Sequence, residues 1–322
     1  MNTLSRRQAL QLGVSASVAW SLAGCAESKR DPLRFGFHPW PGYALVGLAE
    51  DLGKLPRDLV KPVSTPSASA SLRGLSNGVI EAAGLTLDEV LLAREQGTPL
   101  TVVAVVDQSL GADVVLAPEG VQTPAQLKGL RIGAEQTAVG ALMVDATLRA
   151  AGLSATDVTI IDVSIDEHER AVEAGRIDAV VTYEPVKTRL LQKGLREVFS
   201  SAAIPGTIID VLAVRTEVVE QYPDAVRALV AAFFAGREAW VRDAESQVEN
   251  LSKWLSLASS EVMPAFDGLD LISLEDNRRW LQGSTRQIDA VARSVSDILI
   301  RSKLLQKTPD WSNFASGKFL DE

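Results

Sequence analysis

Short runs of β-branched and other apolar residues alternate with helix-length amphipathic segments from about residue 33 onward. The runs predicted as strands are Leu33–Phe37, Val79–Ala83, Leu100–Val106, Val114–Ala117, Arg131–Gly133, Val158–Asp162, Ala179–Val181 and Ile209–Val214. In the intervening segments, apolar residues recur at intervals of three and four, which predicts helices over Leu72–Ser76, Leu87–Gln96, Gly140–Ala151 and Ile165–Ala174. This alternation is typical of an α/β fold with largely parallel sheets.

The pattern changes at Pro223, beyond which no strand is predicted. Apolar stripes there favour a run of packed helices over Ala225–Arg242, Ser246–Leu257, Leu274–Trp280 and Gln287–Ser302. A chain of this length exceeds the size at which a single hydrophobic core usually divides. We therefore expect two compact lobes.

The N-terminus has the order of an export signal. Arg6 and Arg7 precede a mostly apolar stretch without charge, which is too short and too rich in Ser and Gly to span a bilayer of roughly 20 apolar residues. The stretch ends in Leu-Ala-Gly followed by Cys25, which resembles a lipobox. That resemblance implies that residues 1–24 are a signal peptide removed on export, that Cys25 carries a lipid, and that residues 25–32 form a tether.

Two alternatives stay open at this terminus. The arginine pair resembles a twin-arginine motif, while a plain basic segment of an ordinary secretory signal fits as well. Cys25 as a buried structural residue is the other alternative, although nothing around it resembles core. It is the chain's single cysteine, so no intramolecular disulfide can form.

The chain is acidic, with 32 Lys and Arg against 41 Asp and Glu and a net charge of −9. Loss of residues 1–24 removes two arginines and no acidic residue, which makes the charge −11. Nucleic acid is therefore not an expected partner, because binding to phosphate backbones depends on a basic surface. No later segment is long and apolar enough to predict a membrane span.

Several short motifs, in order, resemble periplasmic solute-binding proteins of the nitrate, sulfonate and taurine type. They are Arg-Phe-Gly-Phe-His-Pro-Trp-Pro-Gly-Tyr at 34–43, Ser-Leu-Arg-Gly-Leu-Ser-Asn-Gly at 71–78, Glu-Ala-Ala at 81–83, Leu-Lys-Gly-Leu-Arg-Ile-Gly at 127–133, Gly-Arg-Ile-Asp-Ala at 175–179, Tyr-Glu-Pro at 183–185, Ile-Pro-Gly at 204–206 and Asp-Val-Leu at 210–212. The resemblance covers nearly all of the chain after the signal.

This resemblance implies a type II periplasmic-binding-protein fold, with two mostly parallel sheets, flanking helices and a two-stranded hinge. Lobe 1 would comprise residues 33–115 and 208–322, and lobe 2 residues 116–207. It further implies a monomeric, lipid-anchored protein of the periplasm or cell envelope. Such a protein captures a small solute by hinge closure and delivers it to the permease of an ABC importer.

Open parallel sheets bind ligands beyond the carboxyl ends of their strands, which indicates where a site is expected. In lobe 1 these positions hold His38, Trp40, Tyr43, Ser69, Ser71, Thr86, Asp88 and Ser109. In lobe 2 they hold Glu135, Thr137, Gly140, Tyr183 and Glu184, and Asp210 lies in the return crossover.

For most of these residues, a purely structural role is the alternative to ligand binding. Residues 38–43 are predicted as a loop stiffened by two prolines, whose aromatic side chains either contact ligand or cover the edge of the core. Ser69 and Ser71 either hold an anionic group with the free amides of a helix start or cap that helix. Asp88 either meets the ligand or caps the following helix.

The class of ligand stays open between two chemistries. The aromatic and acidic side chains of the predicted cleft favour an amine-bearing or zwitterionic ligand. The family resemblance implies a sulfonate or similar oxyanion bound through amides and hydroxyls. With only His38 and His168 as histidines and no cysteine beside them, neither a metal site nor a cofactor is expected.

A sensory lipoprotein is one alternative function. An enzyme on the same fold is the other, because fold alone does not settle function. The sequence contains no nucleophile motif, no phosphate-binding glycine loop and no carboxylate pair whose spacing requires acid–base chemistry. The prediction is therefore a binding protein and not an enzyme.

Overall fold

The computed structural model describes residues 31–135 and 139–321, so the predictions for Cys25 and Thr137 lie outside the described residues. Its first sheet has the strand order β11-β4-β10-β3-β1-β2. Strands β2 and β3 pair parallel to β1, whereas β10 is antiparallel to β3 and β4, and β11 is antiparallel to β4. The bounds are β1 Leu33–Phe37, β2 Val60–Ser64, β3 Ala82–Thr86, β4 Leu100–Ser109, β10 Ile209–Arg215 and β11 Leu269–Leu271.

The second sheet has the order β7-β6-β8-β5-β9. Strand β6 is parallel to β7 and β8, and β5 is antiparallel to β8 and β9. The bounds are β5 Val114–Pro118, β6 Arg131–Ala134, β7 Thr159–Asp162, β8 Ala179–Thr182 and β9 Leu195–Ser200. In the first sheet β10 and β11 run opposite to the other strands, and in the second sheet β5 does. Strands β10 and β5 each begin directly after the chain crosses between the sheets.

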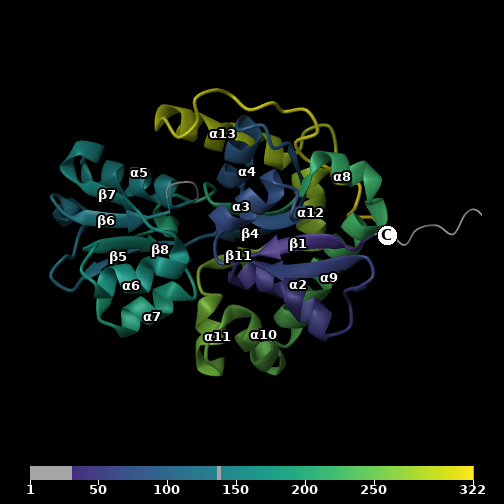
Figure 1. Cartoon of the computed structure of the whole chain (residues 1–322), viewed down its shortest axis with the longest axis horizontal. Coiled ribbons are helices and arrows are strands. Elements are labelled where there is room, and N and C mark those ends of the chain that lie inside the picture. Colours follow the sequence, from purple (N-terminus) through teal and green to yellow (C-terminus); the bar gives the residue numbers. More distant parts are fainter. Residues whose placement is uncertain (1–30, 136–138, 322) are drawn as a thin grey trace, which may run out of the picture. The chain divides into compact units, whose positions relative to one another are not determined.

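The chain crosses between the sheets twice, at residues 110–113 after β4 and at residues 201–208 before β10. Figure 1 shows the two sheets side by side, with the second sheet in teal. The helices of the second sheet are α5 Val139–Ala151, α6 His168–Glu173 and α7 Val186–Gln192. Short 3₁₀ turns lie at Pro124–Leu127, Ala155–Asp157, Ile165–Glu167 and Ser201–Ala203.

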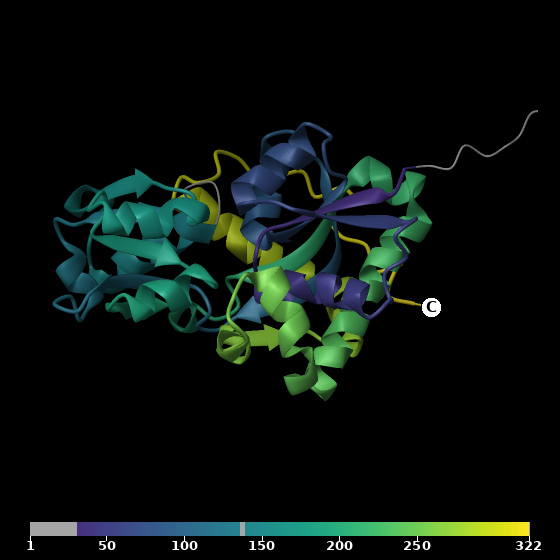
Figure 2. The ribbon, with the colours of Figure 1, turned by 60° about the horizontal axis from the view of Figure 1, so that its bottom comes forward.

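Two groups of helices pack on the first sheet, as Figures 1 and 2 show from two directions. One group contains α2 Pro41–Asp51, α9 Pro223–Arg242, α10 Val248–Leu255 and α11 Ser259–Ala265; the other contains α3 Ala68–Ser76, α4 Leu87–Glu95, α12 Leu274–Leu281 and α13 Gln287–Arg301. Helix α8 Thr216–Gln221 follows β10, and a 3₁₀ turn at Glu245–Gln247 precedes α10.

Helix α2 is the innermost of these helices, because every residue from Pro41 to Ala49 is buried. Apolar and small residues surround its axis, as expected for a helix packed on all sides. Helix α9 approaches it so closely that a Cβ on Gly236 would lie 1.9 Å from the carbonyl oxygen of Leu45. Helix α2 is thereby held firmly against α9.

The predicted loop over residues 38–43 is wrong in its second half. Helix α2 begins at Pro41 with Trp40 as its N-cap, and Tyr43 lies in its first turn. The proline explains this start, because its missing N–H is no loss at the first helical position and its fixed φ suits a helix. The predicted strand over Val79–Ala83 is displaced as well: Val79 is exposed in the turn after α3, and the strand begins at Ala82.

The prediction that strands end before Pro223 is also wrong, because β11 adds an edge strand to the first sheet. Otherwise the α/β fold with two sheets and flanking helices is confirmed. No helix of the described residues is long and apolar enough to cross a membrane.

Candidate functional site

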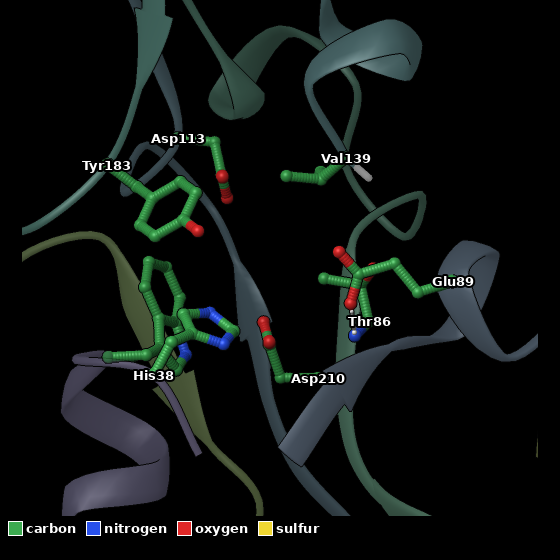
Figure 3. A pocket seen from close by; sticks show the side chains of 8 residues that line it. His38, Thr86, Glu89, Asp113, Val139, Tyr183 and Asp210 are labelled. Carbon is green, nitrogen blue, oxygen red and sulfur yellow. Dashed lines mark hydrogen bonds between the residues drawn. The ribbon is translucent and has the colours of Figure 1, made fainter. Parts of the chain in front are cut away.

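One small cavity draws its walls from both sheets (Figure 3). Its volume is about 10 Å³, roughly the room of one water molecule. The lining residues of the first sheet and its helices are His38, Trp40, Thr86, Glu89 and Asp210, and those of the second sheet and the first crossing are Asp113, Val139 and Tyr183. The cavity therefore lies beyond β1 and β3, as the strand-end rule predicts.

Four aromatic rings cluster on one side of the cavity. Trp40 and Tyr183 meet edge to face with centroids 5.4 Å apart, and the His38 ring lies 5.3 Å from Tyr43 and 5.8 Å from Tyr183. Burial lowers the pKa of His38 to about 4, so its imidazole is neutral at pH 7. The rings thus present faces and edges to the cavity without a positive charge.

A buried pair of carboxyl groups lies behind these rings. Asp107 and Asp210 face each other across the antiparallel pair of β4 and β10. The hydroxyl of Tyr43 donates a hydrogen bond to Asp210 Oδ1, and Trp40 Nε1 donates to Asp107 Oδ2 at 3.2 Å. Burial raises the pKa of Asp107 to about 7, and burial together with the charge of Asp107 raises that of Asp210.

More carboxyl groups lie at the start of helix α4. The Thr86 amide donates to Glu89 Oε2 at 2.9 Å, so Glu89 closes the first turn of the helix from within the cavity wall. Asp88 is buried beside it. Burial raises the pKa of Asp88 to about 6 and, together with the charge of Asp88, also raises that of Glu89.

Asp113 approaches the cavity from the first crossing between the sheets. It is buried, and its pKa is raised to about 7 by that burial. Its backbone amide donates to Ser109 Oγ at 3.2 Å, and Ser109 Oγ in turn lies 2.7 Å from Ser201 Oγ in the second crossing. These two serines tie the crossings together.

The start of helix α3 meets the second sheet directly. The Ser69 amide donates to Glu135 Oε1 at 3.1 Å, and Ser67 is the N-cap, accepting from the Ala70 amide at 3.2 Å. The Ser71 amide donates to the Ser67 carbonyl, while Ser71 Oγ lies 2.8 Å from Thr65 Oγ1. The amides predicted to hold an anionic ligand therefore already have partners in the protein.

The predicted site residues fall into three groups in space. His38, Trp40, Thr86, Tyr183 and Asp210 line the cavity. Tyr43, Asp88 and Glu135 interact with the groups that line it. The remaining described residues, Ser69, Ser71, Ser109, Gly140 and Glu184, are absent from its lining.

Those remaining residues have contacts that explain their positions. Glu184 binds the amide and hydroxyl of Thr188 at 3.2 and 3.0 Å, which fixes the start of α7. Gly140 lets α5 approach Glu135, because a Cβ there would lie 2.6 Å from the Glu135 carbonyl oxygen. Asp88 is not the N-cap of α4, since Thr86 holds that position. Ser69 and Ser109 connect segments, as described above.

The sequence prediction omitted Glu89, Asp107, Asp113 and Val139. Glu89 follows the chosen Asp88 by one residue, and its reach back to the Thr86 amide is the capping-box pattern of Thr followed three residues later by Glu. Asp107 directly follows the predicted strand Leu100–Val106, so the strand-end rule could have selected it. Asp113 precedes a strand, a position that the strand-end rule does not consider.

Two mixed sheets, joined by two crossings and enclosing a cavity between them, define the class of two-lobed periplasmic binding proteins. The chain belongs to the NMT1/THI5-like family, whose model matches residues 60–246. This confirms the predicted family resemblance.

The individual relatives described next have low sequence identity to this chain. A putative aliphatic sulfonates-binding protein of Escherichia coli strain K12 is 22% identical over 310 residues, covering 94% of this chain and 95% of that protein. The alkanesulfonate-binding protein SsuA from Xanthomonas axonopodis pv. citri, bound to MOPS, superposes with a TM-score of 0.72 at 20% identity over 89% of this chain and 99% of that one.

The fold is also used by an enzyme. The desulfurization enzyme DSZB superposes with a TM-score of 0.61 at 18% identity, covering 90% of this chain and 98% of that chain. The binding proteins among the similar proteins support a solute-binding role, while the enzyme shows that the fold alone does not exclude catalysis.

Proposed function

We propose that this chain is the extracytoplasmic solute-binding component of an ABC importer and captures a small molecule between its two sheets. The observation that carries this proposal is the cavity whose walls come from both sheets across two crossings. Enclosure of a ligand between two lobes turns occupancy into a change of shape that a permease can recognise.

The proposed lobes are residues 33–115 with 208–322 and residues 116–207, hinged at the two crossings. Hydrogen bonds between the parts support a closed arrangement, among them these three: Ser69 N to Glu135 Oε1 at 3.1 Å, Arg189 Nη2 to the Ser256 carbonyl at 2.7 Å, and Gln192 Nε2 to Glu261 Oε1 at 2.6 Å. A solute larger than a single water needs the lobes to separate before it enters, because the cavity is only about 10 Å³. Opening would break these three bonds.

Residues 1–24 are proposed to direct export, and Cys25 to carry a lipid that holds the monomeric protein in the cell envelope near its permease. Tethering raises the effective concentration of the binding protein at the transporter. Incorporation of labelled palmitate into the wild-type chain, and none into Cys25→Ser, is the expected result. Equal labelling of both chains would refute the anchor.

Whether the protein converts the captured compound or releases it unchanged distinguishes catalysis from binding. We expect the purified protein, incubated with cell extract and then freed of unbound solutes by gel filtration, to retain about one molecule per chain. Mass spectrometry of the denatured complex should return that compound unchanged after prolonged incubation. Conversion to a different compound would favour an enzyme, and the absence of any retained compound would refute solute binding.

A further inference from the structure

Carboxyl groups dominate the surroundings of the cavity. Glu89, Asp113 and Asp210 line it, and each is at least 98% buried. Asp88, Asp107 and Glu135 lie directly behind, also buried. None of the six takes part in a salt bridge in the described part of the chain, although moving a carboxylate out of water without a partner is costly.

Positive charge is scarce at the same place. Among the described residues, the lining contains neither lysine nor arginine, and its one basic side chain there, His38, is neutral because burial lowers its pKa. Lys187 is the nearby cation: its charge attracts Asp113, but its Nζ lies against the Gly111 carbonyl at 3.4 Å. An anionic ligand would therefore enter a region that already contains an excess of acidic groups.

Several buried polar atoms of the cavity wall have no hydrogen-bond partner among the described residues and could form hydrogen bonds with a ligand. His38 Nδ1, Thr86 Oγ1, Asp113 Oδ2 and Asp210 Oδ2 are buried without a hydrogen-bond partner among the described residues. Figure 3 shows the side chains of these four residues directed toward the common cavity. Each of these atoms can act as an acceptor, the carboxyl oxygens on losing a proton, and they converge from the first sheet and the first crossing.

The backbone amides at the start of α3, which would suit an oxyanion, are already used. The amides at the start of α3 serve Glu135 and Ser67, as described above. Glu135 itself comes from the second sheet, so a carboxylate of the protein occupies the position in which an anionic head group was expected. Beside it, Trp40 and Tyr183 offer the ring surfaces that attract organic cations.

We propose that this cavity receives the positively charged nitrogen of a small organic cation, a protonated amine, amidine or nitrogen heterocycle, in contact with Asp210, Glu89 and Asp113 and beside Trp40 and Tyr183. The inference rests on the proposed solute-binding function and adds its ligand class. A bare metal ion is a poor alternative, because residues 31–135 and 139–321 contain no group of three or more His, Cys, Asp and Glu placed to hold one.

The sign of the pH dependence separates the two ligand classes. A cation favours ionised carboxylates, so its binding releases protons from groups whose pKa burial has raised, and its affinity rises with pH. An anion shows the reverse. The titratable and charged groups that face the site are His38, Tyr43, Asp88, Glu89, Asp107, Asp210 and Asp270 from the first sheet and its helices, Asp113 from the first crossing, and Glu135, Tyr183 and Lys187 from the second sheet and its helices.

The experiment uses probes that share a skeleton and differ in charge: benzylamine, benzamidine, benzyl alcohol and phenylmethanesulfonate. Thermal shift and isothermal titration are run between about pH 5 and pH 8 in phosphate and acetate buffers, because amine buffers would compete. We expect benzylamine or benzamidine to bind, with affinity rising by up to about tenfold per pH unit for each proton released. Benzyl alcohol and the sulfonate should bind at least tenfold more weakly.

Variants connect the binding to the cavity. Asp210→Asn and Asp113→Asn should each weaken cation binding by about tenfold or more, because each removes a charge-assisted contact. Glu119→Gln, an exposed carboxylate after β5, is the matched control and should change nothing. Preferential binding of the sulfonate, or failure of both cationic probes, overturns the inference. In either case a compound retained unchanged from cell extract still supports the proposed function.

Discussion

Replacing Asp113 by asparagine removes an acidic group from the cavity wall and leaves a side chain of nearly the same shape. Asp113 is only 2% exposed, and burial raises its pKa from an ordinary 3.8 to about 7. Between these values the folded chain holds more protons than the unfolded chain. The free energy of unfolding of the wild type therefore falls as the pH rises through this window, and Asp113→Asn does not share that loss.

The magnitude follows from the two pKa values. At about 1.4 kcal/mol per pH unit, the whole window costs the wild type about 4 kcal/mol, of which about 2 to 3 kcal/mol falls between pH 5 and pH 8. Urea denaturation of both chains at several pH values measures the difference in unfolding free energy. We expect the unfolding free energy of the variant, relative to that of the wild type, to increase by about 2 to 3 kcal/mol from pH 5 to pH 8.

The comparison is internally controlled, because any constant effect of the asparagine amide on packing cancels between pH values. The exposed Glu119→Gln should track the wild type throughout. A difference that does not change with pH would mean that Asp113 is already ionised in the fold at pH 5. The protein would then supply a partner for its charge, and the reasoning about an acidic cavity in need of a cation would be refuted.

Three other substitutions test the packing behind the site. Tyr43→Phe removes the donor to Asp210 and should lower the unfolding free energy in urea by about 1 to 3 kcal/mol; no loss would show that water replaces the hydroxyl. Gly84→Ala would place a Cβ 2.5 Å from the Tyr43 ring, and near-ultraviolet circular dichroism should report the displaced ring. Asn277→Ala leaves the amide and carbonyl of Val105 unpaired, with an expected loss of about 2 to 5 kcal/mol, while an unchanged melting temperature would contradict that pairing.

The central strands could be predicted from sequence because their burial leaves continuous apolar runs. β1 was predicted to the residue, and β4, β5, β6, β8 and β10 within a few residues. The edge strand β7 was also predicted within one residue, but the edge strands β2, β9 and β11 were not: β2 contains Lys61 and Pro62, β9 contains the charged pair Arg196 and Glu197, and β11 has only three residues. Their pairing is decided by the neighbouring strand in space, which local pattern does not contain.

The site was predictable as a region and less so as a set of contacts. The rule that ligands bind beyond strand ends led to His38, Trp40, Thr86 and Tyr183, all of which line the cavity. It led to Asp88 instead of Glu89, which lines the cavity; the two are adjacent in sequence but point differently because the helix begins at Leu87. Which of two adjacent residues points toward the cavity depends on where the helix begins, because a shift of the N-cap by one residue changes the direction of both side chains.

Buried carboxyl groups without an ion-pair partner among the described residues are a cost that folding alone does not explain. Neutral or apolar replacements at such positions are often as stable or more stable, so a chain under no demand but folding would lose little by replacing them. Here Glu89, Asp113 and Asp210 converge from α4, the first crossing and β10 on one cavity, beside two aromatic rings. Three independent elements bearing the same costly group at one point indicate a common purpose. A cation in contact with all three carboxyl groups and with the Tyr183 ring of the second sheet would offset part of this cost on binding and would connect the two lobes.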